Sequence, residues 1–305
     1  QNMETKNKTA VQTIAIMGNP NVGKSSIFNQ LTGLNQKIGN YPGVTVDKSL
    51  GFFNHQGGKF QLIDLPGTYS IFPNSEDEVV AFNVLSGLEE EKPDAVLVIL
   101  DACNLERGLL LATQVMDLGI PIGFVLNMKD LSDKKGIQIK SHKLYEELGV
   151  PIIMTDARKA IGLDAIRSMI FENQFHKSKD FLDLSEIINP IIIQKVKERF
   201  NLEQDYRAFQ MIVFAEANRF LSKEDKLWIK NLVEQQGFSL GKAKFEEAKK
   251  RNQKIKSLVN LVVSSSSKKG NDFTRKLDKF FIHPIGGYLV FLGIMLVVFQ
   301  AIFYW

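Results

Sequence analysis

The nonapeptide GNPNVGKSS is the feature that most constrains the fold, and it directly follows the apolar run TIAIM. It satisfies the pattern G-x-x-x-x-G-K-[ST], in which a glycine-rich turn between a strand and a helix directs backbone N–H groups at phosphate oxygens. In such a turn Lys24 neutralises the β- and γ-phosphates, and the Ser25 hydroxyl binds Mg²⁺. Alone, the pattern predicts nucleotide binding without selecting the base. The predicted phosphate-binding residues are Gly18, Asn19, Pro20, Asn21, Val22, Gly23, Lys24, Ser25 and Ser26.

A second motif, DLPG, follows the strand-like run FQLI. The Asp64 carboxylate at this strand end is predicted to hold Mg²⁺ through water, and the N–H of Gly67 to contact the γ-phosphate. Thr68 stands where Ras-like GTPases carry the glutamine that orients the attacking water. Slow intrinsic hydrolysis is therefore expected, with the water held by backbone groups of two loops, the one that carries DLPG and the preceding loop that carries Thr45. The candidate residues of this motif are Asp64, Leu65, Pro66 and Gly67.

Two further motifs, NMKD and TDA, follow the apolar runs IGFVL and PIIM and select the base. Asn127 and Asp130 favour guanine, because the carboxylate accepts hydrogen bonds from the guanine N1 and exocyclic amine, which adenine cannot offer. A backbone N–H of TDA is expected to contact the guanine carbonyl. Four motifs in this order, each at a strand's carboxyl end, converge on one crevice and predict a GTP-binding domain. The candidate base-site residues are Asn127, Met128, Lys129, Asp130, Thr155, Asp156 and Ala157.

A loop rich in Gly and Pro, KIGNYPGVTVDKS, lies between the phosphate turn and DLPG. Its Thr45 is the candidate for a second hydroxyl on Mg²⁺, one that closes in only when a γ-phosphate is present. The alternative is that Thr45 is a β-branched residue at a strand edge. The candidate nucleotide-contacting residues of this loop are Gly43, Val44 and Thr45.

Strand-like apolar runs alternate with segments of helical spacing up to residue 176, which predicts an α/β domain at 11–176. We expect a P-loop GTPase domain with a mostly parallel six-stranded sheet. A turn at Gly57 and Gly58 predicts two strands that add one antiparallel edge. Helical periodicity without a strand signal then predicts an all-α helical domain at 181–263.

The C-terminal part reads as a membrane attachment. Residues 264–283 form a polar linker and an amphipathic juxtamembrane helix, for which an ordinary solvated helix is the alternative. Residues 284–305 are predicted to be the first transmembrane helix, because Ile285–Trp305 carries no charge and ends in Tyr-Trp. The alternative is a buried core helix. Residues before 284 are expected to be cytoplasmic, and the chain is expected to continue into further apolar spans.

The amino-acid composition limits the kinds of ligand and partner that the chain can be expected to bind. The content of 44% hydrophobic and 24% charged residues is that of a globular chain, and a net charge of +4 without a basic run gives no support for a nucleic-acid partner. Cys103 is the only cysteine in the sequence, so an internal disulfide is excluded. The four histidines are scattered without ligand spacing, so we expect no iron ligands in this portion.

The segments GNPNVGKSSIFNQLTG, IGNYPGVTVDK, DLPGTYS, DACNLERGLLL and NMKD resemble, almost word for word, the bacterial ferrous-iron transport protein B (FeoB) family. KLDKFFIHPIGGYLVFL resembles that family's entry into its first transmembrane helix. The resemblance implies a GTPase domain and a helical domain that acts on nucleotide release. These precede a membrane region, located in the bacterial inner membrane, that carries Fe²⁺; homo-oligomers are a further expectation.

The resemblance also implies a K⁺ ion beside the phosphates, held by Asn21, which would offset transition-state charge as an arginine finger does. The alternative is that Asn21 is a turn residue that tolerates an unusual backbone conformation. The residues assigned to catalysis are Asn21, Lys24, Thr45 and Gly67, and the expected cofactors are GTP or GDP, Mg²⁺ and K⁺.

Two alternative functions stay open. One is a GTP-dependent RNA or ribosome assembly factor, which would need a basic, aromatic RNA surface in the helical half. The other is a membrane-anchored regulatory GTPase switch without a transport role, which a single membrane helix in the complete gene would favour.

Overall fold

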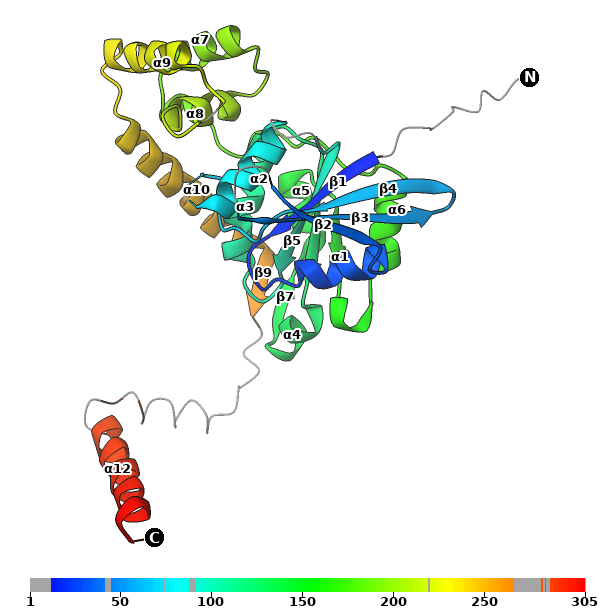
Figure 1. Cartoon of the computed structure of the whole chain (residues 1–305), viewed down its shortest axis with the longest axis vertical. Helices are drawn as coiled ribbons and strands as arrows, with labels where there is room; N and C mark the ends of the chain where they lie inside the picture. The colour runs from blue at the N-terminus through cyan, green and yellow to red at the C-terminus, as the bar shows by residue number, and fades with distance from the viewer. Residues whose placement is uncertain are drawn as a thin grey trace.

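The computed structural model describes residues 12–41, 45–73, 75–87, 92–218, 220–265, 281, 283 and 286–304. Its centre is a seven-stranded sheet of order β2-β3-β4-β1-β5-β6-β8 (Figure 1). β1 pairs in parallel with β4 and β5, and β6 in parallel with β5 and β8. The strands are β1 (Gln12–Gly18), β2 (Gln36–Asn40), β3 (Asp47–His55), β4 (Gly58–Asp64), β5 (Ala95–Asp101), β6 (Ile122–Asn127) and β8 (Ile152–Met154).

The predicted α/β fold class is confirmed, with one strand more than the six expected. β3 runs antiparallel to β4 as predicted, and β2 adds a further antiparallel pairing at the edge. Its sequence QKIGN is exposed over most of its length. The residues that form β2 therefore lack the apolar alternation from which a strand can be predicted.

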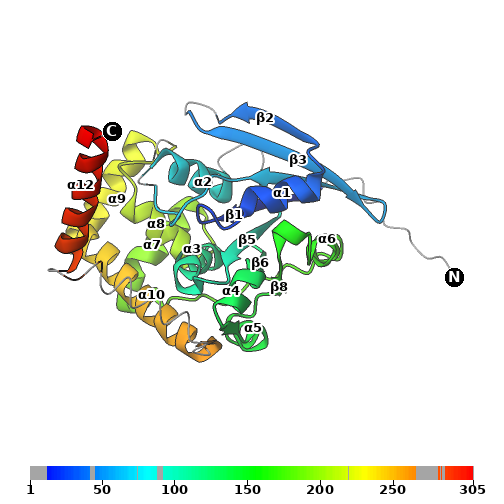
Figure 2. The ribbon, with the colours of Figure 1, turned by 90° about the horizontal axis from the view of Figure 1, so that it is seen from below.

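The helices of the α/β part cover both faces of the sheet (Figure 2). Successive residues of β1 divide between two apolar clusters, because strand side chains alternate between faces. Ile14 and Ile16 pack with α1 and α6, whereas Ala15 and Met17 pack with α2, α3 and α5. The helices are α1 (Lys24–Thr32), α2 (Glu76–Ser86), α3 (Leu105–Asp117), α4 (Lys129–Lys134), α5 (Ser141–Leu148) and α6 (Leu163–Phe171).

A second group of helices follows, and the long α10 connects it to the α/β part (Figure 1). α10 packs against α3, α5 and α8. These helices lie within the predicted domain at 181–263; the exact domain borders stay a prediction. The helices are α7 (Pro190–Phe200), α8 (Asp205–Val213), α9 (Lys223–Gln235) and α10 (Leu240–Val262).

A short antiparallel ribbon ties the end of α10 back to the α/β part. β9 (Val263–Ser265) pairs with β7 (Ile137–Ile139), which follows α4. The carbonyl of Val262 also accepts a hydrogen bond from the N–H of Lys140 at 2.8 Å. The end of α10 and β9 therefore lie beside β7, which contacts α4, and α4 begins within the NMKD motif.

Helix α12 (Gly286–Tyr304) coincides with most of the segment predicted to cross a membrane. In the described part of the chain, no helix meets the length and hydropathy needed for a membrane span. The transmembrane helix at 284–305 thus stays a prediction. The predicted linker and juxtamembrane helix fall largely on residues 266–280, outside the described residues.

Candidate nucleotide-binding site

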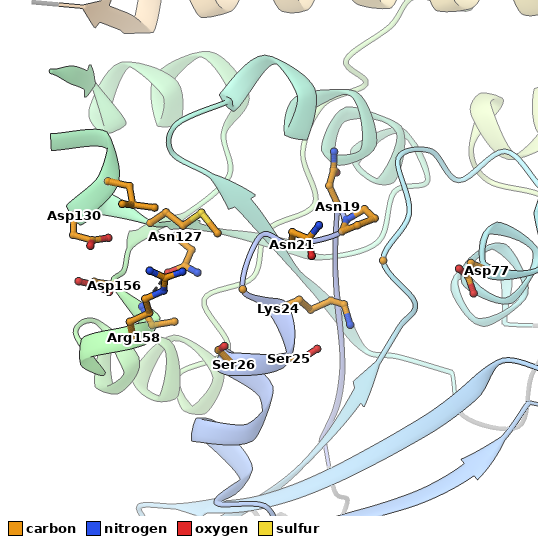
Figure 3. Close-up of a pocket in the computed structure, with 16 residues that line it drawn as sticks. Asn19, Asn21, Lys24, Ser25, Ser26, Asp77, Asn127, Asp130, Asp156 and Arg158 are labelled. Atoms are coloured by element: carbon orange, nitrogen blue, oxygen red, sulfur yellow. Dashed lines mark hydrogen bonds between the residues drawn. The ribbon is translucent and has the colours of Figure 1, made fainter. Parts of the chain in front are cut away.

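A cavity of about 700 Å³ lies at the carboxyl ends of the parallel strands (Figure 3). The phosphate turn lines its centre, with Lys24 and Ser25 at the start of α1, and Asp130 lies at one end beside Asn127. The sequence motifs that were predicted to converge are therefore adjacent in space. The predicted residues that line this cavity are Asn19, Pro20, Asn21, Gly23, Lys24, Ser25, Ser26, Gly67, Asn127, Met128, Asp130, Asp156 and Ala157.

The phosphate turn has the backbone geometry that its sequence predicts. Gly23 has a φ of 86° and Asn21 a φ of 66°, both in the left-handed region. α1 begins immediately afterwards at Lys24, so its N-terminal N–H groups face the cavity. This arrangement offers donors and a positive helix end to a phosphate group.

Lys24 and Asp64 form an ion pair across the turn, and both side chains are largely buried. Burial raises the pKa of Asp64, and the charge and hydrogen bond of Lys24 offset only part of that rise. The two charges that were predicted to meet phosphate and Mg²⁺ thus neutralise each other here. The predicted ligand binding therefore requires the phosphates to replace Asp64 as the partner of Lys24, and Mg²⁺ to replace Lys24 as the partner of Asp64.

The Thr45 hydroxyl is bound to α2 in this structure. Its Oγ1 donates a hydrogen bond to Oε2 of Glu76 at 2.9 Å, at the start of α2. A second cavity, of about 580 Å³, is lined by Thr45, Asp64 and Lys24 together with Glu76. Thr45 and Asp64 therefore share a cavity, whereas Ser25 lines the neighbouring one. Gly43 and Val44 lie outside the described residues.

The Asn127 side chain hydrogen-bonds to two loops of the protein. Its Nδ2 donates to the carbonyl of Val22 at 2.9 Å, and its Oδ1 accepts from Thr155 Oγ1 at 3.1 Å and from the N–H of Ala157 at 3.0 Å. The residue is only 3% exposed. Asn127 thus joins the phosphate turn to the TDA loop. One backbone N–H of TDA was predicted to contact a guanine carbonyl, and that of Ala157 donates to Asn127 here.

The DLPG turn lies against the phosphate turn. A Cβ added at Gly67 would come within 3.3 Å of the Pro20 backbone, so the Gly67 N–H lies close to the phosphate turn. Thr68 is 3% exposed, and its Oγ1 has no hydrogen-bond partner among the described residues. The hydroxyl that replaces the catalytic glutamine therefore faces the protein interior, where it is not placed to orient water.

The sequence analysis missed two charged side chains that line the cavity, Asp77 and Arg158. Asp77 lies in the first turn of α2, well beyond DLPG, and no motif marks it. Arg158 immediately follows TDA and lies at the end that holds Asn127 and Asp156 (Figure 3). Its place next to a base motif was the signal that could have identified it.

Comparisons with known proteins agree with this site. The family model for ferrous iron transport protein B matches residues 12–170. The Fe(2+) transporter FeoB of Leptospira biflexa is 32% identical over 304 residues, which cover 96% of this chain and 44% of that protein. The Fe(2+) transport protein A/Fe(2+) transporter FeoB fusion protein of Porphyromonas gingivalis is 33% identical and covers 99% of this chain. The chain spans 38% of that fusion protein.

Solved structures give the same result. The cytosolic domain of L. pneumophila FeoB has a TM-score of 0.69 at 31% identity, covering 83% of this chain and all of that one. A GDP-bound mutant of the S. thermophilus FeoB G-domain has a TM-score of 0.65 at 32% identity over 83% of this chain and all of that one. Residues 12–170 are accordingly a GTPase domain, and the chain belongs to the ferrous iron transport protein B family.

Proposed function

We propose that this chain binds GTP, hydrolyses it to GDP and phosphate, and forms the nucleotide-dependent portion of a bacterial inner-membrane Fe²⁺ transporter. The observation that carries the proposal is a single cavity with the phosphate turn at its centre and Asp130 beside Asn127 at one end. A carboxylate in that position favours a base with donors at N1 and C2. The relatives that cover most of this chain are Fe²⁺ transporters.

Ser25 and Thr45 are the proposed direct Mg²⁺ ligands, and Asp64 is proposed to hold the ion through water. All three supply oxygen, which Mg²⁺ prefers, and they line adjoining cavities. For Mg²⁺ to bind, the Thr45 hydroxyl has to leave Glu76 and turn to the metal, and Asp64 has to leave Lys24. Lys24 is then free to neutralise the phosphates, and the bound metal would offset the charge that develops on them.

Coupling to the membrane is proposed to run through the helical domain. In this proposal residues before 284 are cytoplasmic, and the first transmembrane helix at 284–305 leads into a membrane region that carries Fe²⁺. The long α10 supports the proposal, because it contacts α3 and α5 and ends in the ribbon that precedes the linker. Self-association of the chain is part of the same proposal.

Base preference is the test of the proposed function. We expect calorimetry to show GTP binding more tightly than ATP by about 10²-fold, since hydrogen bonds to a carboxylate contribute about 1.5–3 kcal/mol each. Asp130→Asn should lose that preference and gain affinity for xanthosine triphosphate, whose 2-oxo group can accept from the new amide. Asp133→Asn is the control, because Asp133 is more than half exposed and, within the described part of the chain, its ion pair is with Lys129. Tighter binding of ATP by the wild type would refute the proposal.

Asn21 is proposed to hold K⁺ beside the phosphates. It lines the cavity, and its φ of 66° is also what a turn asparagine adopts, so the backbone does not decide the role. A bound cation should accelerate hydrolysis, and we expect a rate at least about tenfold higher in K⁺ than in Na⁺. Asn21→Ala should hydrolyse GTP equally slowly in both salts. Equal wild-type rates in the two salts would remove K⁺ from the mechanism.

A further inference from the structure

The segment just beyond the DLPG turn is fixed by a buried glutamine. Oε1 of Gln114 accepts hydrogen bonds from Ser70 Oγ at 3.1 Å and from the N–H of Ile71 at 3.0 Å. Gln114 lies on α3 and is 2% exposed, and Ile71 is fully buried. Ser70 Oγ in turn accepts from the N–H of Phe72 at 3.0 Å. One side-chain oxygen thus sets the path of Ser70–Phe72.

The other side of this segment meets the helical domain. The rings of Phe72 and Phe214 lie 5.1 Å apart, and Phe214 caps the C-terminus of α8. Lys244 of α10 places its ammonium 4.5 Å from the centre of the Phe214 ring. Ser70–Phe72 therefore lies between α3, which holds it through Gln114, and the helical domain, which contacts it through Phe214.

Two backbone hydrogen bonds hold the DLPG turn to β1 and to the start of the phosphate turn, in addition to the ion pair between Asp64 and Lys24. The N–H of Leu65 donates to the carbonyl of Ile16 at 3.0 Å, and that of Thr68 to the carbonyl of Gly18 at 3.2 Å. The Thr68 hydroxyl is buried, so backbone groups of this turn are the proposed holders of a water at the γ-phosphate. The hydrolysis rate then depends on where the turn lies, because small misplacements of reacting groups are costly.

We infer that Gln114 is a positioning residue for GTP hydrolysis, an inference that rests on the proposed function. Its Oε1 holds Ser70 and Ile71, which follow Gly67 closely in the chain, and thereby restrains the turn whose Gly67 N–H is proposed to contact the γ-phosphate. Removing this acceptor leaves the buried Ile71 N–H unpaired and takes the acceptor from the half-buried Ser70 hydroxyl, so the segment shifts to find other partners. The nucleotide itself is not touched by Gln114, so binding is largely independent of it.

The test compares three variants by single-turnover hydrolysis at saturating GTP, with GDP affinity and melting temperature measured alongside. Gln114→Leu removes the acceptor at similar volume and should slow hydrolysis by about 10- to 100-fold, with GDP affinity changed by less than about threefold. Gln114→Glu keeps an acceptor oxygen and should recover most of the rate. Gln210→Leu is the matched control, because Gln210 is a 1% exposed glutamine on α8 with no hydrogen bond to Ser70 or Ile71 among the described contacts. It should hydrolyse GTP at the wild-type rate.

Several results would overturn the inference. They are an undiminished rate in Gln114→Leu, an equal loss in Gln210→Leu or Gln114→Glu, or a loss of GDP affinity in proportion to rate. If Gln114→Leu does not fold, Ser70→Ala removes one of the two donors and should still slow hydrolysis severalfold; an unchanged rate then counts against the inference. Wild-type protein without any GTP hydrolysis would refute the proposed function and this inference together.

Discussion

At the scale of single residues, several groups that are proposed to meet the nucleotide or its metal ion already have partners within the protein. Lys24 pairs with Asp64, Thr45 bonds Glu76, and the Ala157 N–H bonds Asn127. Ligand binding is therefore an exchange of partners, in which no charged group has to wait unpaired in a buried place. The affinity for each ligand then reflects the difference between the old contact and the new one.

The hydrogen bond between Thr45 and Glu76 is expected to oppose binding of the triphosphate. Only the triphosphate form requires Thr45 to leave Glu76, so Glu76→Ala should strengthen binding of a non-hydrolysable GTP analogue and leave GDP binding unchanged. The pair is exposed, so the expected gain is only about two- to fivefold, the effect of one hydrogen bond. Fluorescence titration of both nucleotides measures it. Glu76→Gln keeps the acceptor and should gain less; an equal gain would assign the effect to charge alone.

The residues of the site were largely predictable, and their present partners were not. Phosphate binding demands a glycine-rich turn before a helix, and guanine selection demands a carboxylate at a strand end, so GNPNVGKSS and NMKD identify themselves. Glu76 and Gln114 carry no such signature, because their roles depend on elements brought close by the fold. Arg251 likewise reads in the sequence KKRNQK as one more surface charge, and it is fully buried.

At the scale of elements, a buried ionic cluster joins α3, α8 and α10. Arg251 pairs with Asp117 of α3 and Glu247 of α10, each at 2.7 Å, and Tyr206 of α8 donates to Glu247 at 3.0 Å. Burial alone would lower the pKa of Arg251, but Tyr206, Asp117 and Glu247 raise it, so the guanidinium stays charged. Burial likewise raises the pKa of Asp117, and Arg251 counteracts that rise.

Arg251→Met should therefore destabilise the protein by about 3–5 kcal/mol at neutral pH, because two carboxylates lose their buried cation. Without Arg251 the pKa of Asp117 rises further in the folded state. The folded protein then binds protons more readily than the unfolded chain, so the deficit should shrink as the pH falls. Urea denaturation at pH 7.5 and 5.5 measures this. Arg167→Met is the control: it removes an arginine that pairs with a 92% exposed Asp164 and donates to the carbonyl of Gln30 at 3.0 Å, and it should cost at most about 2 kcal/mol. A loss as large as that of Arg251→Met, or a deficit of Arg251→Met that grows on acidification, would contradict the prediction.

Element prediction succeeded where apolar periodicity was present and failed where pairing alone makes the strand. β5 and β6 are almost wholly buried and were predicted from their apolar runs. β2 is exposed, and β9 is a three-residue strand that continues directly from a helix and pairs with β7 far earlier in the chain. Such a pairing leaves no periodic trace in the sequence.

At the scale of the whole molecule, the α/β part and the helical part share one apolar core. A single cluster contains Val98 of β5 and Leu109 of α3 together with Phe209 of α8 and Ile255 of α10. The two parts were predicted to be separate domains, because the sequence changes there from alternating strands and helices to helices alone. Such a change marks where the type of element changes, but it does not show where the apolar packing ends. A nucleotide-dependent shift of α3 would therefore be felt by α8 and α10.

The contact between Gly23 and Asn127 has a consequence for redesign. A Cβ on Gly23 would come within 2.3 Å of Asn127 Nδ2, and Asn127 also bonds the carbonyl of Val22. A substitution at position 127 that is meant to admit another base should thus also weaken phosphate binding, because it disturbs the phosphate turn. Asp130 makes no hydrogen bond to the phosphate turn among the described contacts. It is therefore the position at which base specificity can be changed while the affinity for the triphosphate is kept.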